Sequence, residues 1–465
     1  MFIIFLLIYI TSFIAAVREI YKGNTSGILT YLIFGLSMYT TAMSVAFTFG
    51  LKDYIPFMQS FKELLIVSVL VLNIAGLKHR PRLHLIDYLI FFFFLYLIIY
   101  ALLPIGGLAL TGRLVSLKSI CFYVVVYFTG RSFDPKMIYI NKYFNYIILL
   151  TIAAAAVVVV EVIFQSPLQF HSGYFDYSYH YYNLQKEGSL GLEEGFTSDS
   201  GYIRFASFFT SPLEHAEATL LALAVIMGLY TTDDNKFKIN SISLLALGAT
   251  LLSIVFALSR APLASYFLMI YVYALLTKKK LITRAIQYAF ILAAVYVIYL
   301  FCQFENNHSG LIAVLLNTID FSDPSSLGHL LAWTEGIISM AQHPFGIGLG
   351  SSGRVGASLN ENIGGENQMI ILGVQAGIIA AILYLTIYIM LIKVSFKWLH
   401  VLKGKERKIC MAVFFIKVGL LISTLTTEIE SSTYLSYMNW FLSGLLISLI
   451  MSKVPTKALS PVPND

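Results

Sequence analysis

Charged residues are scarce in this sequence. Asp, Glu, Lys and Arg make up 12% of the 465 residues, whereas a soluble protein carries about 25%. Apolar residues account for 58% of the chain, and the mean hydropathy is +0.78. A soluble globular enzyme is excluded, because one aqueous core cannot hide so much apolar surface. The apolar residues instead come in runs close to the roughly 20 residues that span a bilayer.

Cysteines and familiar catalytic motifs are also few or missing. The three cysteines, Cys121, Cys302 and Cys410, lie in or beside apolar segments without CxxC spacing, so neither a disulfide framework nor a zinc site is indicated. The sequence has no P-loop, HExxH, GxSxG or strand-linked GxGxxG motif, which removes support for soluble-enzyme chemistry. We expect neither a metal nor a cofactor.

Apolar runs bounded by charge predict an all-α, polytopic integral membrane protein with about thirteen transmembrane helices, within a range of roughly 12 to 14. The first run begins at Met1 and is interpreted as a membrane span rather than a cleaved signal peptide. The predicted spans are 2–17, 28–49, 57–77, 84–103, 114–130, 143–164, 215–230, 242–258, 262–277, 285–302, 368–392, 409–426 and 434–452.

Lys and Arg are distributed unequally between alternate connections. One set of connections carries about 22 of them and the other about 8, and cytoplasmic loops are the ones enriched in Lys and Arg. The N-terminus is therefore expected outside and the C-terminus inside. The formal net charge of +6 follows from this topology, so nucleic acid is not expected as a partner.

Two connections are much longer than the others, and the charge count predicts that both are extracytoplasmic loops. Such long loops are usually functional or disordered. The first is rich in Tyr and Phe, which suit sugar faces and membrane interfaces equally well. The second contains an apolar stretch, Leu327 to Met340, expected to form a helix on the membrane surface.

The chain then divides into N-terminal helices (1–164), the first loop (165–214), central helices (215–302), the second loop (303–367), C-terminal helices (368–452) and a cytoplasmic tail (453–465).

Arginines on the outer side require an explanation, because the topology disfavours them there. Arg204, Arg260 and Arg354 are three of the few. A guanidinium offers a bidentate fork to phosphate oxygens, so these residues are candidates for binding a diphosphate. Binding of lipid phosphate by a snorkelling side chain is the alternative for Arg260.

The second loop supplies further candidates. A glycine-rich segment could bring backbone N–H groups close to an anion, and it reads His343-Pro344-Phe345-Gly346-Ile347-Gly348-Leu349-Gly350. Glu366 and Asn367 follow Gly364-Gly365 and start a span. A partly desolvated carboxylate there would have a raised pKa, which suits a general base. A carboxylate that only stabilises a helix N-terminus is the alternative, and Glu214 and Glu217 are interpreted in that way.

Several motifs follow one another along the sequence: Arg204 to Pro212, Ser259-Arg260, His329 and Trp333, His343 to Gly350, Glu366-Asn367 and Gly377-Ile378. In this serial order they resemble the O-antigen polymerase and ligase family (Wzy-like proteins). The resemblance covers roughly residues 200–390, and the HPFGIGLG block with the downstream Glu-Asn is its most specific part. The resemblance implies a glycosyltransferase of the bacterial cytoplasmic (inner) membrane, active at its outer face without a metal. Its substrate would be an undecaprenyl-diphosphate-linked oligosaccharide for O-antigen (lipopolysaccharide), capsule or exopolysaccharide.

The sequence departs from the family pattern in ways that favour a polymerase over a ligase. The ligase branch usually carries Arg at the position of His329 and His-Asn at the position of Glu366-Asn367. An Arg-x10-Gly pattern described for both large loops of polymerases is met by Arg354 and Gly365, whereas the residue eleven after Arg204 is His215.

The resemblance also implies roles for the candidate residues. Arg204 and Arg260, with Arg354, would stabilise the leaving diphosphate, and either Glu366 or His329 would accept the proton of the acceptor hydroxyl. The substrate loop would include Trp333, His343, Gly346, Gly348, Gly350 and Asn367. Expected partners are the lipid-linked oligosaccharide, membrane lipids and a chain-length-regulating co-polymerase.

Two other functions remain open at this point. A ligase would transfer finished polymer to a different acceptor. A transporter or lipid-linked oligosaccharide flippase would carry ionisable residues at mid-membrane and related halves. The candidates for such residues, Asp87, Glu161 and Lys417, are scattered without a repeat.

Overall fold

The computed structural model describes residues 2–76, 82–184, 190–192, 194–198, 201–302, 324–359 and 362–453. The structure is all-helical, and the extended pairings among these residues are isolated bridges at Thr197–Ile203 and Thr231–Phe237.

The predicted spans 2–17 to 143–164 correspond to α1 (Ile3–Tyr21), α2 (Ile28–Thr30) with η2 (Tyr31–Gly35), α3 (Tyr39–Thr48), η3 (Lys52–Tyr54) with α4 (Ile55–Gln59), α5 (Phe61–Ala75), α6 (Leu85–Leu102), α7 (Leu110–Arg131) and α8 (Ile140–Phe164). The later elements are α9 (Leu168–His171), α10 (Tyr174–Tyr182), η4 (Glu194–Phe196), α11 (Pro212–Tyr230), α12 (Ser241–Phe256), α13 (Arg260–Leu276), α14 (Lys280–Cys302), α16 (Pro324–Gln342), α17 (Gly353–Ser358), α18 (Gln368–Leu399), α19 (Gly404–Thr426), η5 (Ile429–Ser431) and α20 (Thr433–Lys453).

The chain has the architecture of a polytopic membrane protein. Its described residues contain nine helices that are long and apolar enough to cross a membrane, or up to ten if a bent pair forms one span. That pair, Thr25–Gly35 and Tyr39–Thr48, bends by 66° within the predicted span 28–49. The predicted spans 242–258 and 262–277 are the shorter apolar helices α12 and α13. Each of the thirteen predicted segments is therefore helical, but the number that cross the membrane stays a prediction.

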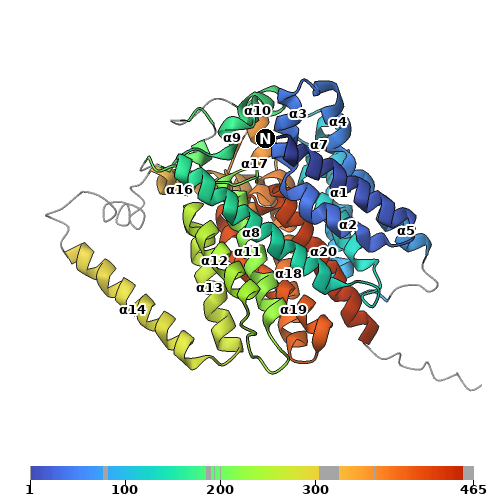
Figure 1. The fold of residues 1–465 in the computed structure, drawn as a ribbon. Coiled ribbons are helices and arrows are strands. Elements are labelled where there is room, and N and C mark those ends of the chain that lie inside the picture. The colour runs from blue at the N-terminus through green and yellow to red at the C-terminus, as the bar shows by residue number, and fades with distance from the viewer. Residues whose placement is uncertain are drawn as a thin grey trace, which may run out of the picture.

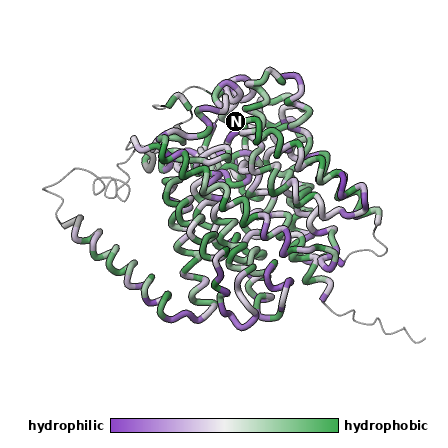
Figure 2. The backbone as a smooth tube through the Cα atoms, in the orientation of Figure 1, coloured by the Kyte–Doolittle hydropathy of each residue, from purple (hydrophilic) through white to green (hydrophobic). Residues whose placement is uncertain are grey.

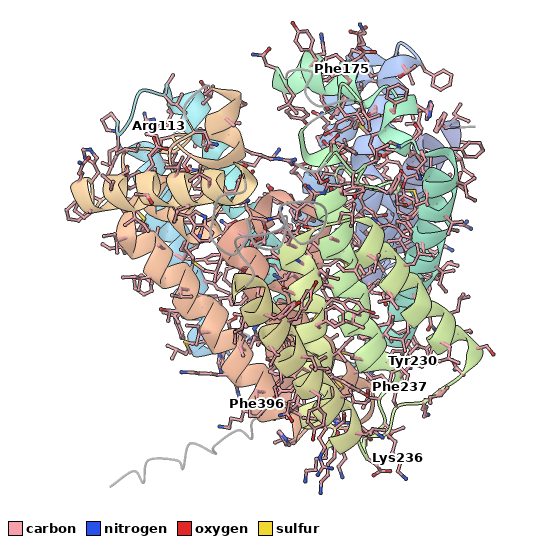
Figure 3. The ribbon with its side chains drawn as sticks, turned by 90° about the vertical axis from the view of Figure 1, so that its left-hand side faces the viewer. Arg113, Phe175, Tyr230, Lys236, Phe237 and Phe396 are labelled. Atoms are coloured by element: carbon pink, nitrogen blue, oxygen red, sulfur yellow. The ribbon has the colours of Figure 1, made fainter. Side chains whose placement is uncertain are left out.

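The two long connections lie at the same end of the bundle. Figure 1 shows α9 and α10 of the first connection near α16 and α17 of the second, and we call this the loop end. Arg113 and Phe175 point toward the loop end, whereas Lys236 lies at the opposite end (Figure 3). Hydrophilic residues gather mainly toward the two ends, with hydrophobic residues between them (Figure 2). This grouping agrees with the predicted alternation of connections.

The best-covered helices are α11, α19 and α20, whose spans are about four-fifths buried within the protein. Trp440 of α20 is a centre of this core, because its ring stacks on Tyr123 of α7 at 4.8 Å between centroids. Apolar helix α14 contacts α13 and extends away from the other helices (Figure 1). One core cluster therefore runs through the bundle: it includes buried residues of α1 to α8, and its best-covered part is formed by α11, α19 and α20.

Parts of the predicted loops and tail lie outside the described residues. These are 185–189, 193 and 199–200 of the first loop, 303–323 and 360–361 of the second, and 454–465 of the tail. The predicted helix at 327–340 is confirmed as part of α16, which runs across the N-terminal end of α18 (Figure 3), while its position on the membrane surface stays a prediction.

Candidate active site

His329, Trp333 and Glu366 come together where α16 crosses the start of α18. His329 Nδ1 lies 3.8 Å from Glu366 Oε2, and the rings of His329 and Trp333 are 6.4 Å apart. The buried Trp333 Nε1 has no hydrogen-bond partner among the described residues. Close packing fixes this junction, since a Cβ added at Gly336 would lie 2.9 Å from the Cα of Gly364. We call His329 and Glu366 the junction pair.

Glu366 lacks the burial that the sequence argument required of a general base. Its side chain is 63% exposed, and that of His329 is 35% exposed. The expectation of a partly desolvated carboxylate is therefore not met in this conformation. Exposure nevertheless leaves the Glu366 oxygens accessible to a hydroxyl group from outside.

Asn367 has a structural role that differs from the expected contact with substrate. Its Oδ1 accepts hydrogen bonds from the backbone N–H groups of Met369 and Ile370 at 2.9 and 3.2 Å. Its Nδ2 donates to the carbonyl of Leu425 at 2.7 Å. Asn367 thus caps α18 and ties it to α19, as an N-cap asparagine typically does.

The glycine-rich segment fills a break in α18. Gly377 has a φ of +86° inside that helix, a conformation that glycine adopts readily. The groups freed by the break are paired: Ile347 N–H donates to the Val374 carbonyl at 2.9 Å, and Ile378 N–H donates to the Pro344 carbonyl at 2.9 Å. A Cβ at Gly346 would lie 2.6 Å from the Gly377 nitrogen. Irregular backbone is tolerated at membrane depth when protein partners satisfy it in this way.

The same hydrogen bonds argue against the expected anion site along this segment. Gly348 N–H donates to the Gln375 carbonyl at 3.1 Å, and Gly350 N–H donates to Gln375 Oε1 at 2.9 Å. Gln375 Nε2 donates in turn to the Ser352 carbonyl at 2.8 Å. These N–H groups are used inside the protein, so a nest for an anion is not formed by them. His343, at the end of α16, has an exposed side chain.

Arg354 lies in α17 beside a carboxylate that the sequence analysis did not select. Its backbone N–H donates to Glu428 Oε2 at 2.7 Å, and the two side chains also interact electrostatically. A Cβ at Gly353 would lie 2.9 Å from the same oxygen. Burial raises the pKa of Glu428, and the nearby Glu366 adds to this effect. Glu428 is thus influenced both by the opposite charge of Arg354 and by the like charge of Glu366.

Glu430, two residues further along, is held from several sides. It accepts hydrogen bonds from Tyr384 Oη at 2.5 Å, from Trp440 Nε1 at 2.9 Å and from Ser436 Oγ. Burial raises the pKa of this carboxyl group. Lys417 lies beyond Trp440, with its Nζ 4.2 Å from the ring centroid and without a hydrogen-bond partner among the described residues. We call Glu428 and Glu430 the η5 carboxylates.

Arg204 and Arg260 belong to the same corner of the loop end. Arg204 Nε donates to the Ala257 carbonyl at 3.2 Å, which ties the first connection to the turn between α12 and α13. Arg260 is the first residue of α13, and its side chain is exposed. The fold therefore brings both arginines to one turn.

The carboxylates of α11 confirm their interpretation in part. Glu214 Oε2 accepts a hydrogen bond from Thr210 N–H at 3.1 Å at the start of the helix. Glu217 is fully buried and accepts from Thr427 Oγ1 at 3.1 Å and Ser432 Oγ at 2.7 Å. Glu217 therefore joins α11 to the α19–α20 connection rather than serving only the helix start.

Sequence reasoning missed the η5 carboxylates and Arg113. A usable signal for the η5 carboxylates was present in the sequence, which places two glutamates in a connection of only a few residues between apolar spans. So short a connection leaves little room for solvent around both side chains, which indicates that at least one of them is enclosed by the protein. Arg113 was counted only for topology. Among the described residues, no group of three or more His, Cys, Asp or Glu side chains could hold a metal ion.

Comparison with known proteins adds no assignment to this geometry. No protein-family model matches the sequence, and no curated protein matches it.

Proposed function

We propose that this protein is a polymerase of undecaprenyl-diphosphate-linked oligosaccharide repeat units in bacterial surface polysaccharide biosynthesis. The proposal includes thirteen membrane spans in the cytoplasmic (inner) membrane, with the loop end facing outward. The observation that carries it is the approach of His329 and Glu366 from separate elements, with Nδ1 and Oε2 3.8 Å apart, while Arg354 N–H contacts Glu428 at the same end of the bundle. A proton acceptor and a cation near one another are what glycosyl transfer from a diphosphate requires.

The proposed reaction is one displacement at a sugar carbon. The hydroxyl oxygen of the acceptor sugar forms a bond to the anomeric carbon of the donor, whose bond to the diphosphate oxygen breaks. The hydroxyl proton passes to the junction pair, either to Glu366 or to His329. Arg204, Arg260 and Arg354 stabilise the negative charge that develops on the departing undecaprenyl diphosphate.

The exposure of the junction pair supports this division of roles. A carboxylate that is 63% exposed can accept a hydrogen bond from an incoming hydroxyl, whereas Glu430 already has three protein donors. Binding of the acceptor would exclude water from Glu366 and bring its carboxylate against the acceptor hydroxyl. Catalytic geometry in unliganded enzymes often tightens only when substrate binds.

The test is the surface polysaccharide of a deletion strain that carries plasmid copies of the gene. We expect single-repeat product in the deletion strain and a full ladder on a gel after complementation with the wild type. Arg260→Ala and Glu366→Gln should not restore the ladder, although both should insert in the membrane at normal levels. Asp176→Asn in α10, which neutralises another exposed acid of the loop end, is the matched control and should restore it.

A ligase is the second candidate, and the same gel separates the two. Loss of a ligase leaves long polymer on the polyprenyl carrier, whereas loss of a polymerase leaves single repeats. A normal ladder in the deletion strain, with no second polymerase present, would contradict both and direct attention to transport.

A further inference from the structure

A cavity of about 440 Å³ lies at the loop end, where three segments meet. The connection between α6 and α7 contributes Gly106 and Gly107, the glycine-rich segment contributes Gly348 and Ser351, and α16 contributes Glu335. Its volume is within the roughly 300–1,000 Å³ typical of small-molecule sites.

Backbone rather than side chains forms much of the wall. A Cβ at Gly348 would lie 2.7 Å from the Cα of Gly106, so the two chain segments are in direct backbone contact. Because both residues are glycines, neither has a side chain that could fill the cavity. Arg113, which is 8% exposed, holds the α6–α7 connection in place by donating from Nη1 to the Leu103 carbonyl. The break in α18 fixes the other wall through the hydrogen bond of Ile347 N–H. The cavity is therefore built by the fold.

The lining chemistry suits a neutral sugar. Hydrogen-bonding groups come from Glu335, Ser351 and Asn362, and apolar surface comes from Leu108 and Ile347. No Lys or Arg is among the lining residues that the structure describes. A diphosphate would call for cations, whereas a sugar ring presents hydroxyl groups on its rim and C–H groups on its faces.

The position of the cavity relates it to the junction pair. Glu335 follows His329 by six residues on α16, about 9 Å along the helix axis. Ile363, another lining residue, precedes Glu366 by three residues. A ligand in the cavity would thus lie within a few sugar lengths of the pair.

We propose that this cavity binds the glycan part of a lipid-linked repeat unit, with Glu335 accepting hydrogen bonds from sugar hydroxyls. The inference rests on the proposed function and adds to it a binding site apart from the arginines. It assigns Glu335 and the α6–α7 connection to substrate recognition, a role that neither the family motifs nor the junction pair suggests.

Gly107→Phe is the sharpest test, because Gly107 lines the cavity and a Cβ there would meet no atom within 4 Å. The ring should occupy the cavity without displacing the fold. Gly248→Phe is the matched control, since Gly248 also has open space around a Cβ but is an exposed residue of α12. Glu335→Gln is a second variant that keeps the shape and removes the charge.

Binding is measured by saturation-transfer NMR, with purified protein in detergent and the free repeat-unit oligosaccharide released from the host polysaccharide. We expect Gly107→Phe to weaken binding by about tenfold or more and Glu335→Gln by about tenfold, the lower end of the range for a lost hydrogen bond to a charged group. Gly248→Phe and Arg260→Ala should bind as the wild type does. Melting temperatures check that each variant is folded.

Failure of the cavity site and failure of the proposed function give different results. If the deletion strain loses its ladder but Gly107→Phe binds the oligosaccharide and restores the ladder like the wild type, the cavity site is overturned and the polymerase remains. If the deletion strain keeps a normal ladder and the wild type binds no oligosaccharide, both are overturned.

Discussion

The two carboxylate regions of the loop end differ in what surrounds them. Glu430 of the η5 carboxylates is 7% exposed and accepts hydrogen bonds from Tyr384, Ser436 and Trp440. Glu366 of the junction pair is 63% exposed and has His329 Nδ1 at 3.8 Å. A carboxylate whose oxygens are occupied by protein donors stabilises structure, whereas an accessible one can exchange a proton with a substrate. The comparison therefore assigns a structural role to the η5 carboxylates and a chemical role to the junction pair.

The largest expected effect is loss of folding in Glu430→Ala. This change leaves the Tyr384 hydroxyl and the Trp440 N–H without their acceptor, and it removes a carboxyl group that interacts electrostatically with the buried Lys417. Each buried polar group left without a partner typically costs about 1–3 kcal/mol. We expect a sharply lower yield of monodisperse protein in detergent and a lower melting temperature.

Glu366→Ala is the matched control for that experiment. It removes the same chemical group from an exposed position, so its melting curve should overlay that of the wild type. Equal losses of stability in the two variants would show that the regions do not differ in the way their burial indicates.

The next effect in size is loss of activity in Glu366→Gln. If the junction pair accepts the proton, the rate of polymerisation should fall by about 10²-fold or more, measured with purified protein and a lipid-linked repeat unit. His329→Ala tests the other member, and the larger of the two losses identifies the base. Melting temperatures should stay unchanged, and a rate close to that of the wild type in both variants would remove the pair from the mechanism.

A smaller effect is expected from Gly353→Ala, which reaches the η5 carboxylates from α17. Gly353 has a φ of +70°, and an added Cβ would lie 2.9 Å from Glu428 Oε2. The left-handed conformation alone costs about 1–2 kcal/mol for an alanine. We expect a modest fall in melting temperature together with reduced activity, because Arg354 follows directly and would move with the chain.

Gly328→Ala in α16 provides the control for this substitution. A Cβ there meets no atom within 4 Å, and the residue is helical, so alanine should be neutral or slightly stabilising. A fall in melting temperature at Gly328 as large as that at Gly353 would argue against the specific contact with Glu428.

The sequence was sufficient to locate the long helices, because long hydrophobic runs predict membrane-spanning helices from local composition alone. The start of α18 at Gln368 agrees with the predicted start of the span at 368. The break at Gly377 was not predictable, because it depends on partners such as Pro344 and Ile347 that lie more than 25 residues away. The environment of Glu430 is also non-local, since Tyr384 is 46 residues away in the chain. Residue type identified candidates for chemistry, but it could not tell the exposed carboxylate from the buried ones.

The smallest expected effect is the pH dependence of stability that Glu428 contributes. Burial raises the pKa of Glu428 above its ordinary value of 4.5, so the folded state favours the protonated form. The stabilising contribution is complete below about pH 4.5 and is lost as the pH rises through the raised pKa. Melting temperatures from pH 4 to 8 should therefore decline less steeply in Glu428→Gln than in the wild type. Asp176→Asn, at an exposed acid, should keep the wild-type slope.

The decline of melting temperature with pH that remains in Glu428→Gln sharpens the comparison between the η5 carboxylates and the junction pair. Burial also raises the pKa of Glu430, so the part of the decline that survives should disappear when Glu430→Gln is added. Glu366→Gln should shift the transition of Glu428 toward lower pH, because the negative charge of Glu366 contributes to the raised pKa of Glu428. A slope that no variant changes would mean that neither η5 carboxyl group has a raised pKa in the folded protein. Burial could then no longer be used to separate the supporting region from the reactive one.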